Sequence, residues 1–205
     1  MQMYLYIHDA ILREVAELET KARELNREDA EEIAALAERM TWFHTMVKQH
    51  EHAEEEILFP AMNARHEFVA ETYQFDHDDF EAHVFDGIDE AFAGLGRAEG
   101  NGERKAAGRL LYRQNVALHE HMRLHISKEN ELLVPKLLEE FDVSEQAEIA
   151  GGMAGLFDPP LMAQTVGWMY RGQNAEDRAG MVAFLEAILP EEAFTGISNM
   201  LAGID

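Results

Sequence analysis

The sequence has 205 residues, a length that suits one domain, or one domain with an appendage, and that can bury a sizeable core. Its formal net charge of −23 argues against nucleic acid and anionic membranes as partners, because both are bound through Lys and Arg. The absence of Cys excludes disulfides, thiolate zinc sites and iron–sulfur ligation. We find neither a signal-peptide pattern nor an apolar run near the ~18 residues of a membrane span, so we expect a soluble, cytoplasmic protein.

Apolar residues recur at steps of three and four along four segments, and no segment alternates as a strand does. The predicted helices cover about residues 4–25, 30–63, 76–95 and 103–141. Gly94 to Gly102 is interpreted as the break before the last of them. The pattern predicts an all-α fold in which residues 1–141 form an up-down four-helix bundle.

The composition changes in residues 142–205, which hold no ligand-like cluster of His. Glycines and prolines divide this region into three or four short helices, at Gly151-Gly152, Pro159-Pro160, Gly172 and Pro190. We therefore predict a C-terminal helical extension. It either packs on the bundle or binds a protein partner, and packing on the bundle is favoured.

A motif of His, three residues and Glu occurs twice, as His50/Glu54 and His125/Glu129. Each copy is followed by a branched aliphatic residue, Leu, one residue and Pro. On a helix, residues at i and i+4 lie on one face, and here that face continues an apolar stripe. The stripes are Leu36, Met40, Phe43, Val47, His50, Glu54, Ile57 and Ala61, and Leu118, Met122, His125, Glu129 and Leu132. A carboxylate in an apolar core is costly unless it is paired or bound to metal, so the repeat predicts one buried metal centre.

Two further histidines share a smaller pattern, His-Asp-x-[Ile/Phe]-x3-Val, which begins at His8 and at His77. Each lies early in the predicted helix that precedes a His-x3-Glu helix, and we predict both as ligands. His83 is the alternative to His77, because His83 and His125 are separated by the same interval as His8 and His50.

The other polar residues near the motifs are predicted to lie outside the centre: His44, His52, His66, His119, Glu51, Glu55 and Glu56. The three glutamates among them are interpreted as part of a solvated face. One case stays open, because His121 lies one turn before His125 and could be a fifth imidazole or orient another ligand.

Four imidazoles and two carboxylates are too many ligands for one tetrahedral zinc ion, but they suit two ions that share a bridging carboxylate. Nitrogen and oxygen ligands without sulfur favour iron, with manganese or zinc as alternatives. The Glu-x-x-His signature of ferritin-like di-iron bundles is absent from the sequence. A centre rich in His favours reversible ligand binding over oxidase chemistry.

The order His, His-x3-Glu, His, His-x3-Glu resembles the hemerythrin-like, or HHE cation-binding, family over about residues 4–141. The resemblance implies a non-haem di-iron site in an up-down bundle, with terminal ligands His8, His50, His77 and His125 and bridging ligands Glu54 and Glu129. Glu129 stands where marine-worm hemerythrins have Asp, and the Cys-bearing region of iron–sulfur-cluster repair members has no counterpart. The tail resembles regions that follow such domains in some bacterial and plant iron-sensing proteins.

Together, these observations predict a protein that binds dioxygen, nitric oxide or iron as a sensor, carrier or buffer. The alternative is a di-iron enzyme that acts on nitric oxide or peroxide, which Tyr6 or His121 as a proton donor in the pocket would favour. A metal-free scaffold is disfavoured by the repeated motif.

Overall fold

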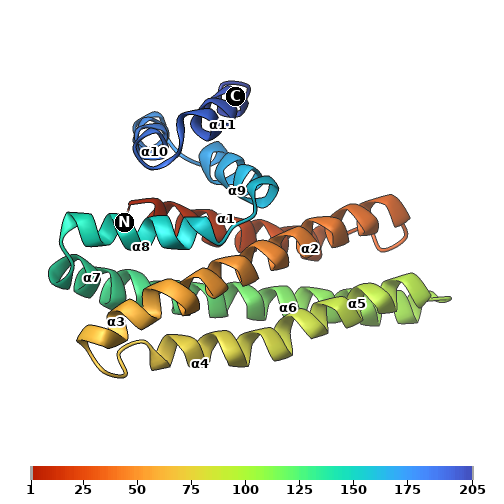
Figure 1. Cartoon of the computed structure of the whole chain (residues 1–205). Coiled ribbons are helices and arrows are strands. Elements are labelled where there is room, and N and C mark those ends of the chain that lie inside the picture. Colours follow the sequence, from red (N-terminus) through yellow and green to blue (C-terminus); the bar gives the residue numbers. More distant parts are fainter. Residues whose placement is uncertain (1, 205) are drawn as a thin grey trace.

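The computed structural model describes residues 2–204, except for the side chains of residues 2 and 79–82. The secondary structure of this part of the chain is entirely helical (Figure 1). Four long rods form the main body, and three of them contain a π-helical turn. The first rod is α1 (Gln2–Glu24), and the second is α2 (Ala30–Ala53), η1 (Glu54–Leu58) and α3 (Phe59–Arg65). The third is α4 (Glu71–Phe80), η2 (Glu81–Phe85) and α5 (Asp86–Arg97), and the fourth is α6 (Asn101–Lys128), η3 (Glu129–Leu133) and α7 (Val134–Glu140).

Each rod packs against the next one in the chain, and the fourth returns to the first. The contacting pairs are α1 with α2, α2 with α5, α5 with α6, and α6 with α1 (Figure 1). The predicted all-α four-helix bundle is therefore confirmed. The third rod begins at Glu71, earlier than predicted, and Gly94 and Gly96 lie inside α5 instead of ending it.

A π-turn follows each His-x3-Glu motif, and a proline explains its position. Pro60 and Pro135 have no N–H to donate, and a proline ring collides with the carbonyl of the preceding α-helical turn. The wider turn removes this conflict: the Phe59 N–H bonds to the Glu54 carbonyl, and the Val134 N–H bonds to the Glu129 carbonyl.

The extra residue in each π-turn shifts the buried face by one position. Leu132, which we predicted on the core stripe, is 63% exposed, whereas Leu133 is 1% exposed. In the second rod Ile57 is only half-buried and Leu58 is fully buried. The predicted stripes are thus correct up to Glu54 and Glu129 and wrong beyond them, because the prediction assumed one unbroken α-helical period.

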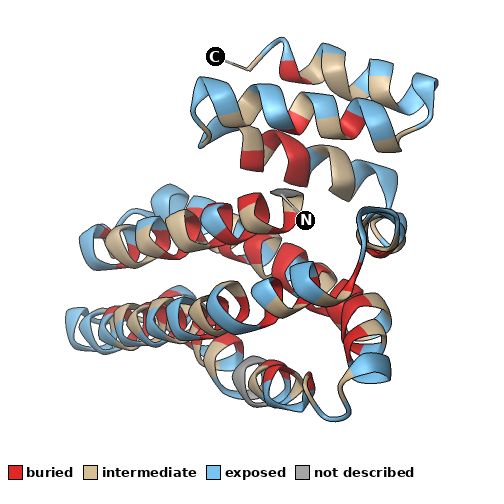
Figure 2. Cartoon of the chain, turned by 90° about the vertical axis from the view of Figure 1, so that its left-hand side faces the viewer, coloured by how far each residue is buried: buried red, intermediate tan, exposed pale blue. Residues whose placement is uncertain are grey.

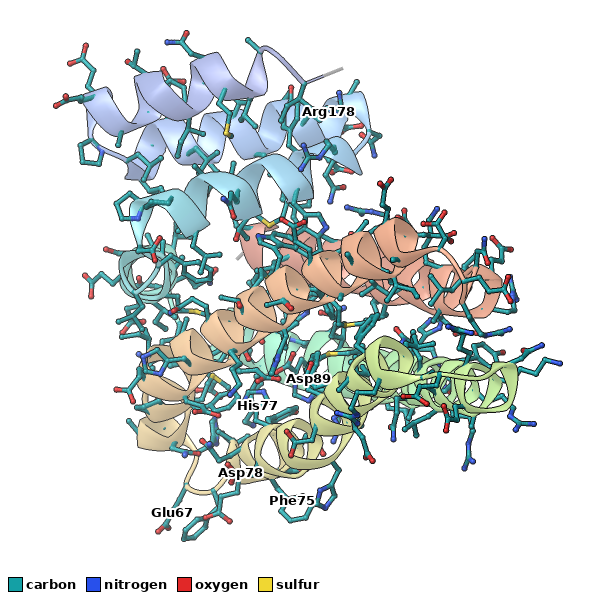
Figure 3. All side chains as sticks on the ribbon, turned by 90° about the vertical axis from the view of Figure 1, so that its right-hand side faces the viewer. Glu67, Phe75, His77, Asp78, Asp89 and Arg178 are labelled. Atoms are coloured by element: carbon teal, nitrogen blue, oxygen red, sulfur yellow. The ribbon has the colours of Figure 1, made fainter. Side chains whose placement is uncertain are left out.

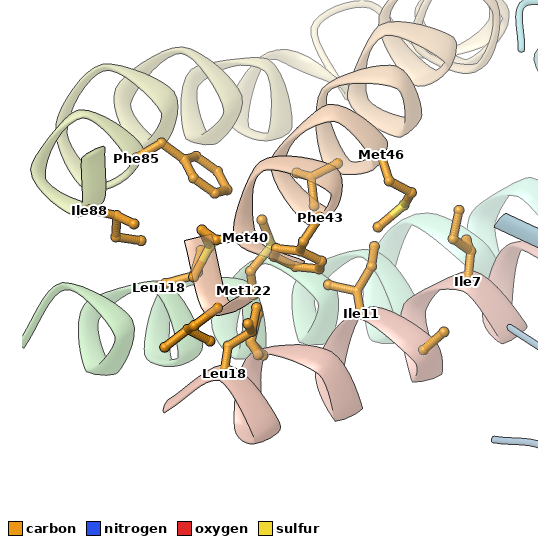
Figure 4. Packing of buried hydrophobic residues seen from close by; sticks show 14 of the residues in the cluster. Ile7, Ile11, Leu18, Met40, Phe43, Met46, Phe85, Ile88, Leu118 and Met122 are labelled. Carbon is orange, nitrogen blue, oxygen red and sulfur yellow. The ribbon is translucent and has the colours of Figure 1, made fainter. Parts of the chain in front are cut away.

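Two apolar clusters fill the bundle on either side of the layer that contains the two His-x3-Glu motifs. The larger cluster includes Phe43, Met46, Phe85, Leu118 and Met122 (Figure 4). The smaller cluster lies around the proline ends of the second and fourth rods and includes Leu58, Phe59, Met62, Leu133 and Leu137. The buried polar residues of the two motifs occupy the layer between them.

The extension contains α8 (Val143–Gly155), α9 (Pro159–Arg171), α10 (Ala175–Ile188) and α11 (Glu191–Leu201). It packs on the bundle: α8 lies against α2 and η1, and α9 and α10 lie against α1 (Figures 1 and 2). The hydrogen bonds that join the parts include one from Trp168 Nε1 to Glu14 Oε2 (3.1 Å) and one from the Tyr6 hydroxyl to Asp177 Oδ1 (3.1 Å). A role of residues 142–205 in binding a protein partner stays a prediction.

The predicted break at Gly151-Gly152 is wrong, since both residues lie inside α8. Gly152 instead permits close packing: a Cβ there would lie 3.2 Å from Ile57 Cγ2. The absence of a side chain brings α8 close to the π-turn that begins with Glu54. Among the helices that the structure describes, none is long and apolar enough to cross a membrane.

Candidate metal centre

The six residues predicted as ligands converge in the layer between the two apolar clusters. Each is at most 6% exposed: His8, His50, Glu54, His77, His125 and Glu129. All four rods contribute, and the two glutamates are the first residues of η1 and η3. Figure 3 shows His77 on the inner side of α4, while the neighbouring Phe75 and Asp78 lie toward the outside.

The carboxylate of Glu54 faces two histidine pairs at once. Its Oε1 lies 3.3 Å from His50 Nε2 and 4.0 Å from His8 Nε2. Its Oε2 lies 3.5 Å from His77 Nε2. One oxygen of Glu54 is therefore directed to each side of the centre.

Glu129 is placed in the same way from the opposite rod. Its Oε1 lies 3.4 Å from His125 Nε2, and its Oε2 lies 3.2 Å from His8 Nε2. The centre thus has two halves, one with His8 and His50 and one with His77 and His125. Each half receives one oxygen from each carboxylate, and both halves contain sets of groups that could hold a metal ion.

Two histidines are oriented by the residue that follows a motif glutamate on another rod. His8 Nδ1 lies 2.7 Å from Asn130 Oδ1, and His77 Nδ1 lies 2.9 Å from Glu55 Oε1. Oxygen acceptors at these positions fix the proton on Nδ1, so each Nε2 presents a lone pair to the centre. The sequence analysis missed both roles, although Glu55 and Asn130 occupy the same position in the repeat.

His125 is oriented by Asp76, the residue before His77. Its Nδ1 lies 3.2 Å from Asp76 Oδ2, which Lys128 also contacts. Partial burial alone would raise the pKa of Asp76, but the hydrogen bonds from His125 and Lys128 outweigh it and lower the pKa to about 2. Asp76 therefore stays ionised beside His125 Nδ1, while the Nε2 of His125 lies 3.2 Å from His77 Nε2.

The donor set of the centre is incomplete without a cation. Within the part of the chain that the structure describes, His8 Nε2, Glu54 Oε2 and both oxygens of Glu129 are buried and have no hydrogen-bond partner. Facing lone pairs and carboxylate oxygens repel one another, and buried polar groups without partners are costly. Imidazole nitrogens and carboxylate oxygens are ligands that iron, manganese and zinc accept, so the residues fit a metal centre.

Burial also changes the proton affinities of these groups. It raises the pKa of Glu129 to about 8 and the pKa of Glu54 well above its usual range, with further repulsion between Glu54 and Glu129. Burial lowers the pKa of His8 and of His77 to about 3. The apolar surroundings thus favour neutral groups, and a bound cation would allow the carboxylates to ionise.

Tyr4 is a further residue of this centre that the sequence analysis missed. Its hydroxyl donates a hydrogen bond to Glu54 Oε1 at 2.6 Å. Burial, with the nearby carboxylates, raises the pKa of Tyr4 well above 10, so the hydroxyl stays protonated. Tyr4 lies one helical turn before His8, and that i, i+4 spacing was a usable signal. The expected candidate Tyr6 points instead to Asp177 in the extension.

The remaining histidines, including the alternative ligand His83 and the open case His121, do not join the six residues of the centre. His83 is exposed, so the structure brings His77, and not His83, to the other groups. His52 is exposed, and His121 stacks beside His125 with ring centroids 6.3 Å apart. His44, His66 and His119 contact Phe85, Glu140 and Glu19, respectively.

The predicted solvated face is wrong for two of its three glutamates. Glu51 is only 6% exposed, and Glu55 bonds to His77 as described above. Glu56 is exposed, as predicted. Glu55 and Glu56 lie within the π-turn, which changes the direction of their side chains, whereas Glu51 lies before it in α2.

A helical bundle with a buried centre of histidines and glutamates defines a class of cation-binding proteins. The chain matches the Hemerythrin HHE cation binding domain over residues 3–137, and it belongs to this family. It is 26% identical over 190 residues to Zinc finger protein BRUTUS of Arabidopsis thaliana, covering 93% of this chain and 15% of that protein. A BRUTUS-like zinc finger protein of the same plant is 21% identical over 193 residues, with the same coverage of 93% and 15%. The chain therefore spans only a small part of these curated relatives. No solved structure matches it.

Proposed function

We propose that the chain is a non-haem di-iron protein that binds dioxygen, nitric oxide or iron itself, as a sensor, carrier or buffer. One observation carries the proposal: Glu54 and Glu129 each direct one oxygen to each histidine pair. A carboxylate placed in this way suits a bridge between two ions better than a ligand of one. Membership in a family of cation-binding domains supports the same conclusion.

The proposal assigns His8 and His50 to one ion and His77 and His125 to the other. Glu54 and Glu129 are the bridging ligands. Two nitrogens and two oxygens for each ion leave open positions on a metal that prefers six ligands, and iron fits this donor set without sulfur. When bound, the two ions supply the affinity for a diatomic molecule.

The chain's own residues position and protect this site. Asn130, Glu55 and Asp76 hold three imidazole rings in one tautomer, with Nε2 toward the centre. The Tyr4 hydroxyl donates a hydrogen bond to Glu54 Oε1 and so helps to orient that carboxylate. The apolar clusters on both sides exclude water, which strengthens electrostatic interactions within the layer.

Tyr4 also supports a second candidate function, a di-iron enzyme that acts on nitric oxide or peroxide. Such reactions consume protons, and the hydroxyl of Tyr4 is a protonated donor at the centre. The Tyr4→Phe variant separates the two functions, because it should slow turnover at least tenfold in an enzyme and leave the stoichiometry of ligand binding unchanged. Turnover of peroxide or nitric oxide should be measured for both proteins at equal metal content.

Metal analysis of freshly purified protein, with optical spectra recorded with and without oxygen, tests the main proposal. We expect two metal ions per chain, predominantly iron after expression with iron available. A single ion per chain, or a site that holds only zinc after such expression, would contradict it.

Matched variants test the assigned register. His50→Ala should lose metal, whereas His52→Ala, two residues along the same helix but exposed, should retain it. Equal metal loss in both variants would mean that the ligand face has been assigned incorrectly.

A further inference from the structure

A cavity lies between the bundle and the extension. The extension forms most of its wall, through α8, α9 and α10, which lie around the amino-terminal end of α1 (Figure 1). The side chains that line it on this side include Met153, Phe157, Met169, Phe184, Leu185 and Leu189. The floor is formed by α1 and α2, with Ile7 and Ala53. The cavity therefore exists only where the extension covers the bundle.

The volume of the cavity is about 110 Å³. Apolar cavities of ~150 Å³ stay dry and bind benzene or xenon, so the space suits a molecule of about one aromatic ring or smaller. Its lining contains no Lys, Arg, Asp or Glu, and an ion would lose its hydration without compensation there. The occupant that fits is therefore small and uncharged.

One polar group in the wall has no partner. Thr165 in α9 is 2% exposed, and its hydroxyl oxygen has no hydrogen-bond partner within the described part of the chain. The other helical threonines with recorded hydroxyl bonds donate to the carbonyl four residues earlier: Thr20, Thr41, Thr45 and Thr195. Thr165 does not make this bond, and an unsatisfied buried hydroxyl is costly. A ligand with a single polar atom would remove that cost.

The floor of the cavity also touches the candidate metal centre. Tyr4 and His50 line it, and both contact Glu54: the Tyr4 hydroxyl donates a hydrogen bond to Oε1, and His50 Nε2 lies 3.3 Å from the same oxygen. A molecule in the cavity would therefore lie beside the half of the centre that contains His8 and His50. The far half, with His77 and His125, takes no part in the lining.

We propose that this cavity is a binding site for a small, uncharged molecule with an apolar body no larger than about a benzene ring and one hydrogen-bonding group for Thr165. The inference goes beyond the proposed function, because none of the contacts that define the site requires a metal ion. Residues 142–205 then have a role of their own: they complete a ligand site that the bundle alone does not form.

Benzene and phenol are suitable probes, and isothermal titration of the purified full chain is a suitable assay. We expect both to bind saturably, one per chain, with phenol two- to tenfold tighter through its hydroxyl. Benzoate, with the same ring and a charge, should not bind. Phenol should still bind more tightly than benzene after chelation, and this result would separate the site from metal coordination. Loss of phenol's advantage on chelation would overturn the role given to Thr165.

Two matched substitutions in α8 locate the binding. Ala150→Leu fills the cavity and should weaken both probes at least tenfold. Ala147→Leu adds the same side chain at an exposed position one turn earlier and should change neither more than twofold. Should Ala150→Leu unfold, as judged by circular dichroism, Ala154→Leu fills the same cavity from the next turn. Failure of the probes to saturate, or equal binding by the filled variant, would overturn the proposal.

Thr165→Val tests the polar group separately. It keeps the shape of the side chain and removes the hydroxyl, so benzene binding should stay within twofold while phenol loses its advantage. A phenol advantage that survives this substitution would overturn the assignment to Thr165. Metal content measured on the same samples reports on the di-iron proposal independently, so failure of one does not imply failure of the other.

Discussion

Replacement of both glutamates of the candidate metal centre, in Glu54→Gln/Glu129→Gln, should stabilise the metal-free protein in a pH-dependent manner while abolishing metal binding. Without metal, the two carboxyls share an apolar layer, and burial raises the pKa of each. Glutamine keeps the size of the side chain and cannot ionise. The difference in unfolding free energy between the two proteins therefore reports the cost of ionising these groups.

The size of the effect follows from Glu129. Its pKa rises from 4.5 to about 8, and at about 1.4 kcal/mol per pKa unit the displacement corresponds to about 5 kcal/mol. Below pH 4.5 the carboxyl of Glu129 is protonated in both the folded and the unfolded chain. The full stability linked to its raised pKa is therefore present there. As pH rises toward 8, the unfolded chain ionises first, and the folded protein loses that stability. The cost is a large part of the ~5–15 kcal/mol that stabilises a typical domain.

Urea unfolding with chelator, at pH 5 and pH 8, measures the difference. The stability of wild type relative to the variant should fall by several kcal/mol between the two pH values. His8 and His77 titrate in the opposite sense but are present in both proteins, so the comparison largely removes their contribution. Added metal at ~100 times its dissociation constant should stabilise wild type by about 2.7 kcal/mol and leave the variant unchanged. A shared carboxylate centre would be refuted if wild type and variant had the same unfolding free energy at both pH values and chelation did not change that of wild type.

Three further predictions use single substitutions. His77→Ala should lose bound metal, whereas His83→Ala should retain it because His83 is exposed; metal analysis after dialysis decides, and retention in His77→Ala would reverse the assignment. Glu55→Ala should weaken metal affinity about 10–100-fold by releasing the His77 ring, as measured by competition with a chelator; unchanged affinity would show that Glu55 does not orient the ring. Thr165→Val should raise the unfolding free energy by about 1 kcal/mol in thermal denaturation, since it removes a buried hydroxyl without a partner within the described chain, and a loss of stability would contradict that.

The sequence was sufficient to predict the four-helix bundle because each rod carries a long apolar stripe, and long periodic segments are the most reliable signal. The convergence of His50, Glu54, His125 and Glu129 followed from their i, i+4 spacing on those stripes. The predicted break at Gly151-Gly152 was wrong for a physical reason that concerns Gly152. A glycine is tolerated inside a helix when another element packs against it, and that packing is visible only in three dimensions.

Helical periodicity could not predict the residues that orient the imidazoles. Asn130 serves a histidine on α1, and Glu55 serves one on α4, so each pair joins two rods whose relative position no local pattern specifies. The π-turns were equally hidden, although Pro60 and Pro135 mark both of them. The exposure of Leu132 is the direct result of the π-turn at Glu129–Leu133.

The π-turn at Glu129–Leu133 also sets the angular position of everything that follows it. Each residue of an α-helix turns the chain by about 100°. Insertion of one further residue before Leu132 would therefore rotate α7 by about a quarter of a circle and bring Leu132 inward. Because α7 leads through Phe141 and Asp142 into α8, the same rotation would swing the extension away from the cavity beside His50. The count of residues in one turn beside the candidate metal centre thus governs where the cavity next to His50 is formed.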